Sequence, residues 1–327
     1  MNNINRRSVL KGMASIAAAS TFGPLAYAQE YPQRPVRVIV PYAAGGASDI
    51  VARFISASLS EKMGQSFFVD NRGGGASIVG TQAVANSQPD GYTIGIIDSA
   101  FTINPSLFAG ELPYDTKADF APVSLLARTS LLLVVHPSLP VKDVKELVAL
   151  AKAKPNTLNM ATAGLGTAVH LGCEQFRQVA GINVVAVPYR GGGPSIIDLL
   201  SGKVDFTFST IPAVLGHIRA GKLKALGNTA GRVAQLPDVP TMADSGFPGV
   251  DAAPDFGVVA PARVPEAILT QLSTGLRDVM KSEDLRKRLN DIGIEPIGST
   301  PAEFAKHVDA SIEKWKKIVV AGSIKPR

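Results

Sequence analysis

Pro41-Tyr42-Ala43-Ala44-Gly45-Gly46-Ala47-Ser48-Asp49 directly follows the apolar run Val36–Val40 and precedes an amphipathic stretch that ends at Met63. A short continuous apolar run is typical of a buried strand, and apolar residues three and four apart predict a helix. The nine residues are therefore expected to form a strand-to-helix turn. Glycine lets the backbone approach a ligand, and the free N–H groups that begin a helix attract anions. This turn is thus a candidate anion site.

A second glycine-rich turn, Ala161-Thr162-Ala163-Gly164-Leu165-Gly166-Thr167, follows Leu158–Met160 and precedes the helical pattern Val169–Val179. Because the two turns lie far apart in the sequence, we expect them in different lobes, each holding one end of a small anion. Many α/β proteins also use glycine at such turns merely to change chain direction. That structural role stays open for both turns.

Apolar runs alternate with amphipathic stretches along the chain, which predicts an α/β fold with mostly parallel sheets flanked by helices. We expect two lobes, with residues 29–128 and 254–327 in lobe 1 and residues 129–253 in lobe 2. Leu131–Val135 and Phe256–Ala260 are expected to cross between the lobes as a hinge. Ligands of such sheets bind beyond the carboxyl ends of the strands, where both glycine turns fall.

Several further elements follow from periodicity and from start signals. Thr300-Pro301-Ala302-Glu303 predicts the beginning of the last helix, with threonine as N-cap, proline at the first helical position and glutamate three residues after the cap. The other expected strands and helices are Phe67–Val69, Ile78–Ala85, Tyr92–Ile97, Val144–Ala153, Val184–Val187, Ile196–Leu200, Phe206–Phe208, Val214–Ile218 and Val258–Val259.

Met1–Ala28 has the pattern of an export signal. Arg6, Arg7 and Lys11 precede an alanine-rich apolar stretch, and Ala26-Tyr27-Ala28 is an A-x-A cleavage site. We therefore expect cleavage after Ala28 and a periplasmic product. The adjacent arginines resemble a twin-arginine signal, and the general secretion route stays open. A membrane-anchoring helix is the alternative interpretation.

The composition is that of a globular protein: of 327 residues, 46% are hydrophobic and 18% are charged. The expected signal contains three cations and no acidic residue, so its removal would lower the net charge from +6 to +3. A small, scattered excess of positive charge suits anionic ligands but lacks the basic stripe that nucleic acid requires. Cys173 is the sole cysteine, which excludes an intrachain disulfide.

The sequence offers no support for a cofactor, a metal or a catalytic centre. His136, His170, His217 and His307 lack metal-ligand spacing, and neither a dinucleotide fingerprint nor a phosphate-binding loop with its serine or threonine is present. His170, Cys173 and Glu174 lie three and four residues apart on one expected helix. This spacing suits a nucleophile pair, but packing is the simpler role without an orienting group and an oxyanion site.

A set of short motifs resembles the tripartite tricarboxylate transporter receptors, the Bug-type periplasmic solute-binding proteins. The resemblance covers essentially the whole chain after the expected signal. Its motifs are, in order, Tyr31-Pro32-x-Arg34-Pro35-Val36-Arg37-x-Ile39-Val40-Pro41-Tyr42, Gly45-Gly46-x-x-Asp49, Asn71-Arg72-x-Gly74, Pro89-Asp90-Gly91-Tyr92-Thr93, Asn104-Pro105, Pro113-Tyr114-Asp115, Phe120-x-Pro122-Val123, Gly164-x-Gly166-Thr167-x-x-His170-Leu171, Val187-Pro188-Tyr189-Arg190-Gly191-Gly192, Pro237-Asp238-Val239-Pro240-Thr241 and Trp315.

The resemblance implies a two-lobed type II periplasmic binding protein fold that closes over a small carboxylate and delivers it to two membrane permease subunits. We expect a monomer. The ligand-binding positions that it implies are Tyr42, Ala43, Gly46, Ser48 and Asp49 in the first turn, and Ala163, Gly164, Gly166, Thr167 and His170 in and after the second.

Arg72 and Arg190 are further candidates, because each is flanked by glycine and an arginine can bind a carboxylate with two parallel hydrogen bonds. Arg190 stands where many relatives carry lysine. Both could equally be surface arginines, and Ser48, Asp49 and Thr167 could be helix caps. A sensory or adaptor receptor is the alternative function, and an enzyme on the same bilobal architecture is a third. The sequence does not identify the solute.

Overall fold

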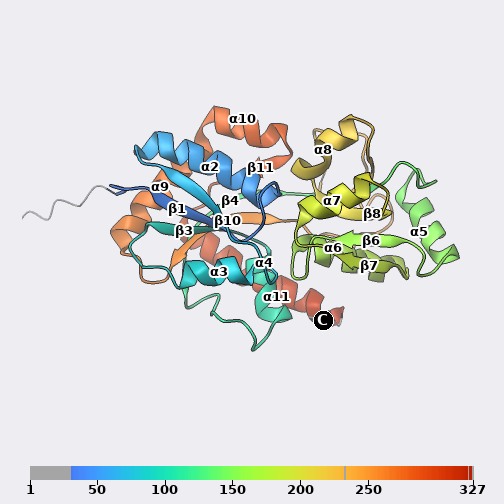
Figure 1. Cartoon of the computed structure of the whole chain (residues 1–327), viewed down its shortest axis with the longest axis horizontal. Helices are drawn as coiled ribbons and strands as arrows, with labels where there is room; N and C mark the ends of the chain where they lie inside the picture. Colours follow the sequence, from blue (N-terminus) through green and yellow to red (C-terminus); the bar gives the residue numbers. More distant parts are fainter. Residues whose placement is uncertain (1–30, 232, 323, 326–327) are drawn as a thin grey trace, which may run out of the picture. The chain divides into compact units, whose positions relative to one another are not determined.

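The computed structural model describes residues 31–231, 233–322 and 324–325. The expected signal peptide and its cleavage site lie outside these residues. From Pro32 onward the chain forms one compact unit that contains two separate sheets, each flanked by helices (Figure 1). Within the described part of the chain, every helix is too short or too polar to cross a bilayer.

The first sheet has six strands and the second has five. In the order β11-β4-β10-β3-β1-β2, the first comprises β1 (Val36–Val40), β2 (Phe67–Asn71), β3 (Thr93–Asp98), β4 (Phe120–Thr129), β10 (Asp255–Pro261) and β11 (Ile294–Pro296). In the order β7-β6-β8-β5-β9, the second comprises β5 (Leu131–Val135), β6 (Asn159–Thr162), β7 (Val185–Pro188), β8 (Phe206–Thr210) and β9 (Lys224–Asn228).

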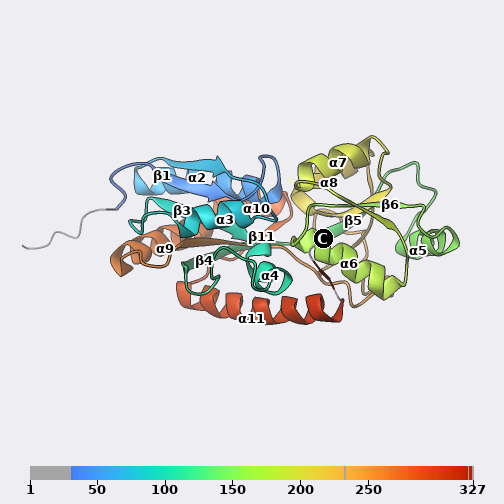
Figure 2. The same ribbon diagram turned by 60° about the horizontal axis from the view of Figure 1, so that its bottom comes forward.

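Helices follow most of the strands, as the periodicity predicts; the exceptions are the consecutive strands β4–β5 and β9–β10 and the consecutive helices α9–α10 (Figures 1 and 2). Those belonging to the first sheet are α2 (Ala47–Met63), α3 (Ile78–Ala85), α4 (Ala100–Leu107), α9 (Glu266–Lys281), α10 (Glu283–Asp291) and α11 (Pro301–Ala321). Those of the second are α5 (Val144–Ala153), α6 (Ala168–Ala180), α7 (Gly192–Leu200) and α8 (Ile211–Arg219).

The expectation of mostly parallel sheets is wrong in its detail, because both sheets are mixed. Only β1 with β2 and β3, and β6 with β7 and β8, pair in parallel. β10 is antiparallel to both β3 and β4, β11 to β4, and β5 to both β8 and β9. The reason is the path of the chain: β4 runs out of the first sheet into β5, and β10 brings the chain back in the opposite direction.

Both passages between the sheets are short and are hydrogen-bonded to each other. Ser130 alone separates β4 from β5, and Pro254 directly precedes β10. The Thr129 N–H donates to Pro254 O at 3.0 Å, and the Thr229 hydroxyl donates to Ala252 O at 2.6 Å. The two passages therefore form one narrow connection. The lobe boundaries expected from the sequence remain a prediction.

Helix α11 provides a further link between the sheets. Its predicted N-terminus is confirmed, since Thr300 and Glu303 form a reciprocal capping box. Near its start, Phe304 lies in the apolar core of the first sheet. Near its end, Trp315 and Val319 join the core built on β5, β6 and β8. One helix thus contributes to both cores (Figure 2).

A polar cluster fixes the start of β10 to its neighbours. The Asp255 carboxylate accepts from Arg128 Nε at 2.6 Å on β4 and contacts His307 Nε2 at 2.8 Å on α11. Burial pushes the pKa of Asp255 up, but these hydrogen bonds outweigh it and hold the pKa below its ordinary value. Ser311 Oγ approaches the same His307 nitrogen at 3.2 Å. In a catalytic triad the two ring nitrogens of the histidine contact different partners, whereas here His307 Nε2 faces both Asp255 and Ser311. These three residues therefore cannot relay a proton as a catalytic triad does.

Gly257 in β10 provides a test of how tightly α11 packs on the first sheet. A Cβ at Gly257 would overlap the tip of the buried Phe304 ring. We expect Gly257→Ala to lower the free energy of unfolding by about 1–3 kcal/mol. The control is Gly216→Ala, because Gly216 is exposed within α8 with open space around it. It should raise stability by about 0.5–1 kcal/mol. Equal stability of Gly257→Ala and wild type in denaturant titrations would show that the ring has room to move.

Candidate functional site

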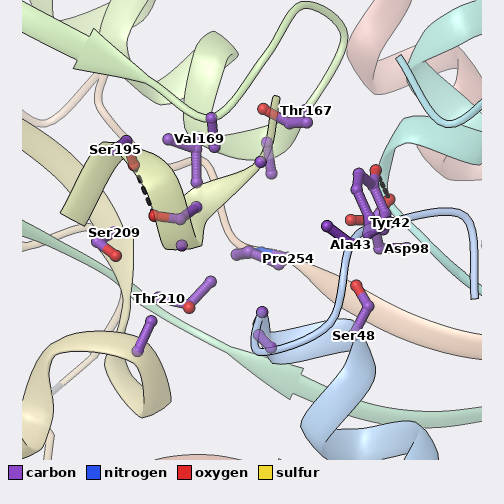
Figure 3. Close-up of a pocket in the computed structure, with 18 of the residues that line it drawn as sticks. Tyr42, Ala43, Ser48, Asp98, Thr167, Val169, Ser195, Ser209, Thr210 and Pro254 are labelled. Atoms are coloured by element: carbon purple, nitrogen blue, oxygen red, sulfur yellow. Dashed lines mark hydrogen bonds between the residues drawn. The ribbon is translucent and has the colours of Figure 1, made fainter. Parts of the chain in front are cut away.

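One pocket lies between the two sheets and is lined by residues from both (Figure 3). It encloses about 760 Å³ of space, part of it open to solvent. Its wall on the side of the first sheet comes from the turn after β1, the end of β3 and the start of β10. Its opposite wall comes from the turns after β6, β7 and β8.

Four helices begin at this pocket. α2 follows β1, α6 follows β6, α7 follows β7 and α8 follows β8, and residues at the start of each helix line the pocket. Three of these strands, β7, β6 and β8, are neighbours in the second sheet, so their helices begin side by side. No side chain caps the first turn of α2, α7 or α8. Their free N–H groups and the positive ends of their dipoles make this pocket attractive to an anion.

The first glycine turn is held from behind by Asp49. Its Oδ2 accepts from the Gly45 N–H and from Arg53 Nε, both at 3.0 Å, and its Oδ1 accepts from Asn71 Nδ2 at 3.0 Å. Asn71 Nδ2 also donates to Tyr42 O at 3.1 Å. Asp49 is buried, so its carboxylate serves the turn and does not face the pocket. These contacts favour a structural role for Asp49.

Tyr42, Ser48 and Asp98 form the polar part of the first wall (Figure 3). The Tyr42 hydroxyl donates to Asp98 Oδ1 at 2.8 Å, and the Ala100 N–H donates to the same oxygen at 2.9 Å. Burial and the Asp98 charge raise the pKa of Tyr42 well above its ordinary value, so the phenol stays a donor. Burial also raises the pKa of Asp98, to about 6, against the opposing effect of these hydrogen bonds.

The opposite wall carries hydroxyl groups and backbone but few charges. Thr167 accepts from the His170 N–H at 3.1 Å and donates to Gly164 O at 2.9 Å, so its hydroxyl caps α6. Ser195 donates to Gly192 O at 2.8 Å. Ser209 and Thr210 complete this wall at the end of β8, opposite Tyr42 and Ser48 (Figure 3).

The structure brings together most of the residues that the sequence proposed. Those that line the pocket are Tyr42, Ala43, Gly46, Ser48, Ala163, Thr167 and Arg190. Those that do not are Asp49, Arg72, Gly164, Gly166 and His170. Each of these five residues lies outside the pocket lining and has different neighbours. The predicted residues that remain in the candidate site lie in the turns before α2, α6 and α7 and in the first turn of α2.

Gly166 and His170, which the family resemblance implies as ligand-binding residues, lie outside the lining of this pocket. Gly166 has φ +73°, and a Cβ there would lie 2.5 Å from Asn104 Oδ1 of α4, so this glycine permits close packing of the second turn on α4. His170 is the third residue of α6 and lines a separate hollow with Glu174 and Arg177.

Arg72 and Gly164 also face away from the pocket. Arg72 Nε pairs with Asp70 at 2.8 Å on an exposed stretch, and Gly164 packs near Tyr189 O. Arg190 is exposed at the rim of the pocket, directly before the glycine turn that begins α7.

Sequence reasoning missed a third glycine turn and the end of β3. Gly191-Gly192-Gly193 lies between a short strand and an apolar helix, the same signal that identified the other two turns. Asp98 directly follows the predicted strand Tyr92–Ile97, at the end where ligands of α/β sheets bind, and so could have been nominated. The other missed lining residues are Ala44, Ala47, Ala168, Val169, Pro194, Ser195, Phe208, Ser209, Thr210, Ala213, Pro254 and Phe256.

Cys173 lies in the core and not at a reactive surface. Its side chain is fully buried, and burial raises the pKa of the thiol to about 12, the opposite of what a thiolate nucleophile requires. Across the described residues, histidine, cysteine and carboxylate side chains form no group of three that could hold a metal ion. Cys173 is therefore a packing residue, whereas His170 and Glu174 line the separate hollow.

Comparison with known proteins identifies a matching family. The sequence model of the "Tripartite tricarboxylate transporter family receptor" matches residues 51–323. BugT of Bordetella pertussis is 34% identical over 306 residues, which span 93% of this chain and 94% of BugT. These matches confirm the resemblance that the sequence motifs predicted.

Two solved structures are similar to this chain in fold as well as in sequence. A protein of R. palustris, solved with adipate, is 36% identical with a TM-score of 0.88, covering 91% of this chain and 100% of that one. MatC from Rhodopseudomonas palustris, with bound malate, is 31% identical with a TM-score of 0.83, covering 88% of this chain and 100% of MatC. The expected two-sheet α/β fold of periplasmic binding proteins is thereby confirmed.

The role assigned to Asp49 predicts a pH-dependent loss of stability. We expect Asp49→Ala to lower the free energy of unfolding by about 2 kcal/mol at pH 7, because it leaves the Gly45 N–H, Asn71 and Arg53 without their acceptor. Burial raises the pKa of Asp49, but hydrogen bonds from Arg53, Gly45 and Asn71 bring it below its ordinary value.

A carboxylate with a lowered pKa stabilises the folded state fully above its unfolded pKa, about 4, and progressively less as the pH falls through its folded pKa. The difference between wild type and Asp49→Ala should therefore be constant from pH 8 to 5 and shrink below pH 4. Asp70→Ala is the control, because Asp70 pairs only with the exposed Arg72 and should change stability by under about 0.5 kcal/mol. A difference that grows in acid would contradict the assignment.

Proposed function

The chain belongs to the tripartite tricarboxylate transporter receptors, and we propose on this premise that it captures a small dicarboxylate in the pocket between its two sheets. The observation that carries the proposal is the convergence of the N-termini of α2, α6, α7 and α8 on one pocket. A carboxylate placed there accepts hydrogen bonds from backbone N–H groups that no side chain caps in α2, α7 and α8.

The proposed ligand class follows from the two-sided wall and from the relatives. N–H groups on both sides suit an anion with a carboxylate at each end, and the apolar Val169, Phe208 and Phe256 suit a short carbon chain between them. The structures with adipate and with malate support dicarboxylates of this size. Arg190 at the rim adds a positive charge that attracts such ligands.

We further propose that the two parts of the chain close over the ligand about the paired passages at Ser130 and Pro254. Contacts from both walls are complete only in the closed form, so the ligand stabilises that form. The proposed place of action is the periplasm, supported by the export pattern of Met1–Ala28. The proposed partners are two membrane permease subunits, in keeping with the family description.

Binding measurements on the purified protein test this function. We expect titration calorimetry to show saturable one-to-one binding of adipate, malate or another linear dicarboxylate, and mass spectrometry to recover that ligand unchanged. If the ligand were recovered chemically converted, the protein would be an enzyme and the proposed receptor function would be wrong. Absence of binding to a panel of dicarboxylates of different lengths would refute the proposal.

The substitution Gly46→Val tests whether the first glycine turn contributes to ligand binding. Gly46 lines the pocket at the N-cap of α2 and has an extended backbone with open space around its Cα, so valine fits the fold but fills the approach to the α2 N–H groups. We expect affinity to fall by about 10- to 100-fold, the loss of one hydrogen bond to a charged group. Gly216→Val, also in open space but outside the pocket, should bind as wild type does. Unchanged affinity in Gly46→Val would remove this turn from the site.

A further inference from the structure

A carboxyl group stands in the wall of a pocket that is otherwise suited to anions. Asp98 ends β3 and lines the pocket beside Tyr42 and Ser48 (Figure 3). Its Oδ1 already accepts hydrogen bonds from the Tyr42 hydroxyl and from the Ala100 N–H. The Ser48 hydroxyl also interacts with this carboxyl group. An ionised Asp98 would place a negative charge next to the incoming carboxylate.

No cation neutralises Asp98 within the described part of the chain. The ion pairs of the described residues do not include Asp98: Arg53 pairs with Asp49 on α2, and Arg128 pairs with Asp255, which adjoins the β10 residue opposite Asp98. Arg190 lines the pocket from the opposite wall and is exposed at its rim.

The remaining titratable groups around Asp98 are weak acids or are already paired. Tyr42 donates to it from the turn after β1, and Tyr114 lies close enough to Tyr42 to affect it. On β10, Phe256 pairs with Asp98 in the sheet, and the adjacent Asp255 has His307 of α11 as its second partner. The charge state of Asp98 is therefore not set by a salt bridge and responds to burial and to the ligand.

We propose that Asp98 contacts the ligand and links its capture to a proton: the neutral carboxyl donates a hydrogen bond to a ligand carboxylate, and the ionised form repels it. The inference rests on the proposed dicarboxylate function of this pocket. Because Oδ1 already accepts two hydrogen bonds, the proton of the neutral form belongs on Oδ2. One ligand carboxylate then replaces the water that would solvate that hydroxyl.

The direction of the pH dependence follows from the environment of Asp98. Burial raises its pKa to about 6, so the neutral form is populated near neutrality and dominates in mild acid. Affinity for a dicarboxylate should fall as the pH rises through 6. If only the neutral form binds, the fall between pH 6 and pH 8 is roughly 50-fold.

Asp98→Asn separates this effect from every other titration. Asparagine keeps the size of the side chain and an oxygen for Tyr42 and Ala100, and its amide donates as the neutral carboxyl would. Affinities for adipate and for malate are to be measured by calorimetry from pH 5.5 to pH 8.5 in both proteins. Since both proteins meet the same ligand, the ionisation of the ligand cancels in their ratio.

We expect the ratio of the affinity of Asp98→Asn to that of wild type to rise with pH, approaching 50-fold at pH 8 relative to pH 6. Asp284→Asn is the matched control, because the Asp284 side chain on α10 is 79% exposed. The affinity of this variant for each dicarboxylate should equal that of wild type at each pH. A constant ratio for Asp98→Asn overturns the inference. The inference is also overturned if Asp98→Asn fails to bind at every pH at which wild type binds, because the site would then require the ionised carboxylate. Failure of wild type to bind either probe at any pH refutes the dicarboxylate function itself.

Discussion

The positive ends of four helix dipoles meet at one pocket, and most of the surrounding structure holds them in place. Each helix is the next element after a strand, so the sheet that holds the strand also positions the start of the helix. Asp49 fixes the turn before α2 and Thr167 the turn before α6, while α7 and α8 begin without a side-chain cap. Backbone N–H groups that no side chain caps are stable next to water or an anion, which makes the pocket ready for a ligand before one arrives.

The two sheets are joined by more than their two passages. Trp315 and Val319 of α11, with Ile103 and Leu107 of α4, belong to the same apolar core as β5 and β8. Gly166 allows the second turn to pack directly on α4. Movement about Ser130 and Pro254 must therefore either keep these apolar contacts or expose Trp315 to water, at the cost of its buried area. A small rotation of one sheet relative to the other that keeps α11 packed on both cores is therefore favoured over a wide separation of the sheets.

The sequence predicted the elements with strong local signals and failed where long-range packing decides. Val36–Val40 and the Thr300 cap were recognised because their signals are short and complete. Helix α4 was missed because Pro105 lies within it, and β9 because its residues do not alternate clearly. For the site, position along the chain was predictable but rotation about the helix axis was not: Thr167 and Val169 line the pocket, whereas His170 lies in the other hollow. Asp98 needed the fold, because its significance comes from neighbours far away in sequence.

The central position of β10 has a consequence for biosynthesis. β5 to β9 are contiguous in sequence, so the second sheet can assemble from one uninterrupted segment of nascent polypeptide. The first cannot: β3 and β4 do not pair with each other, and β10, which joins them, is synthesised more than a hundred residues after either. Until that strand arrives, the edges of β3 and β4 are unpaired and open to association with other chains. A premature stop between Asn228 and Asp255 leaves the second sheet complete, whereas the first sheet consists of the paired strands β1, β2 and β3 and a separate, unpaired β4.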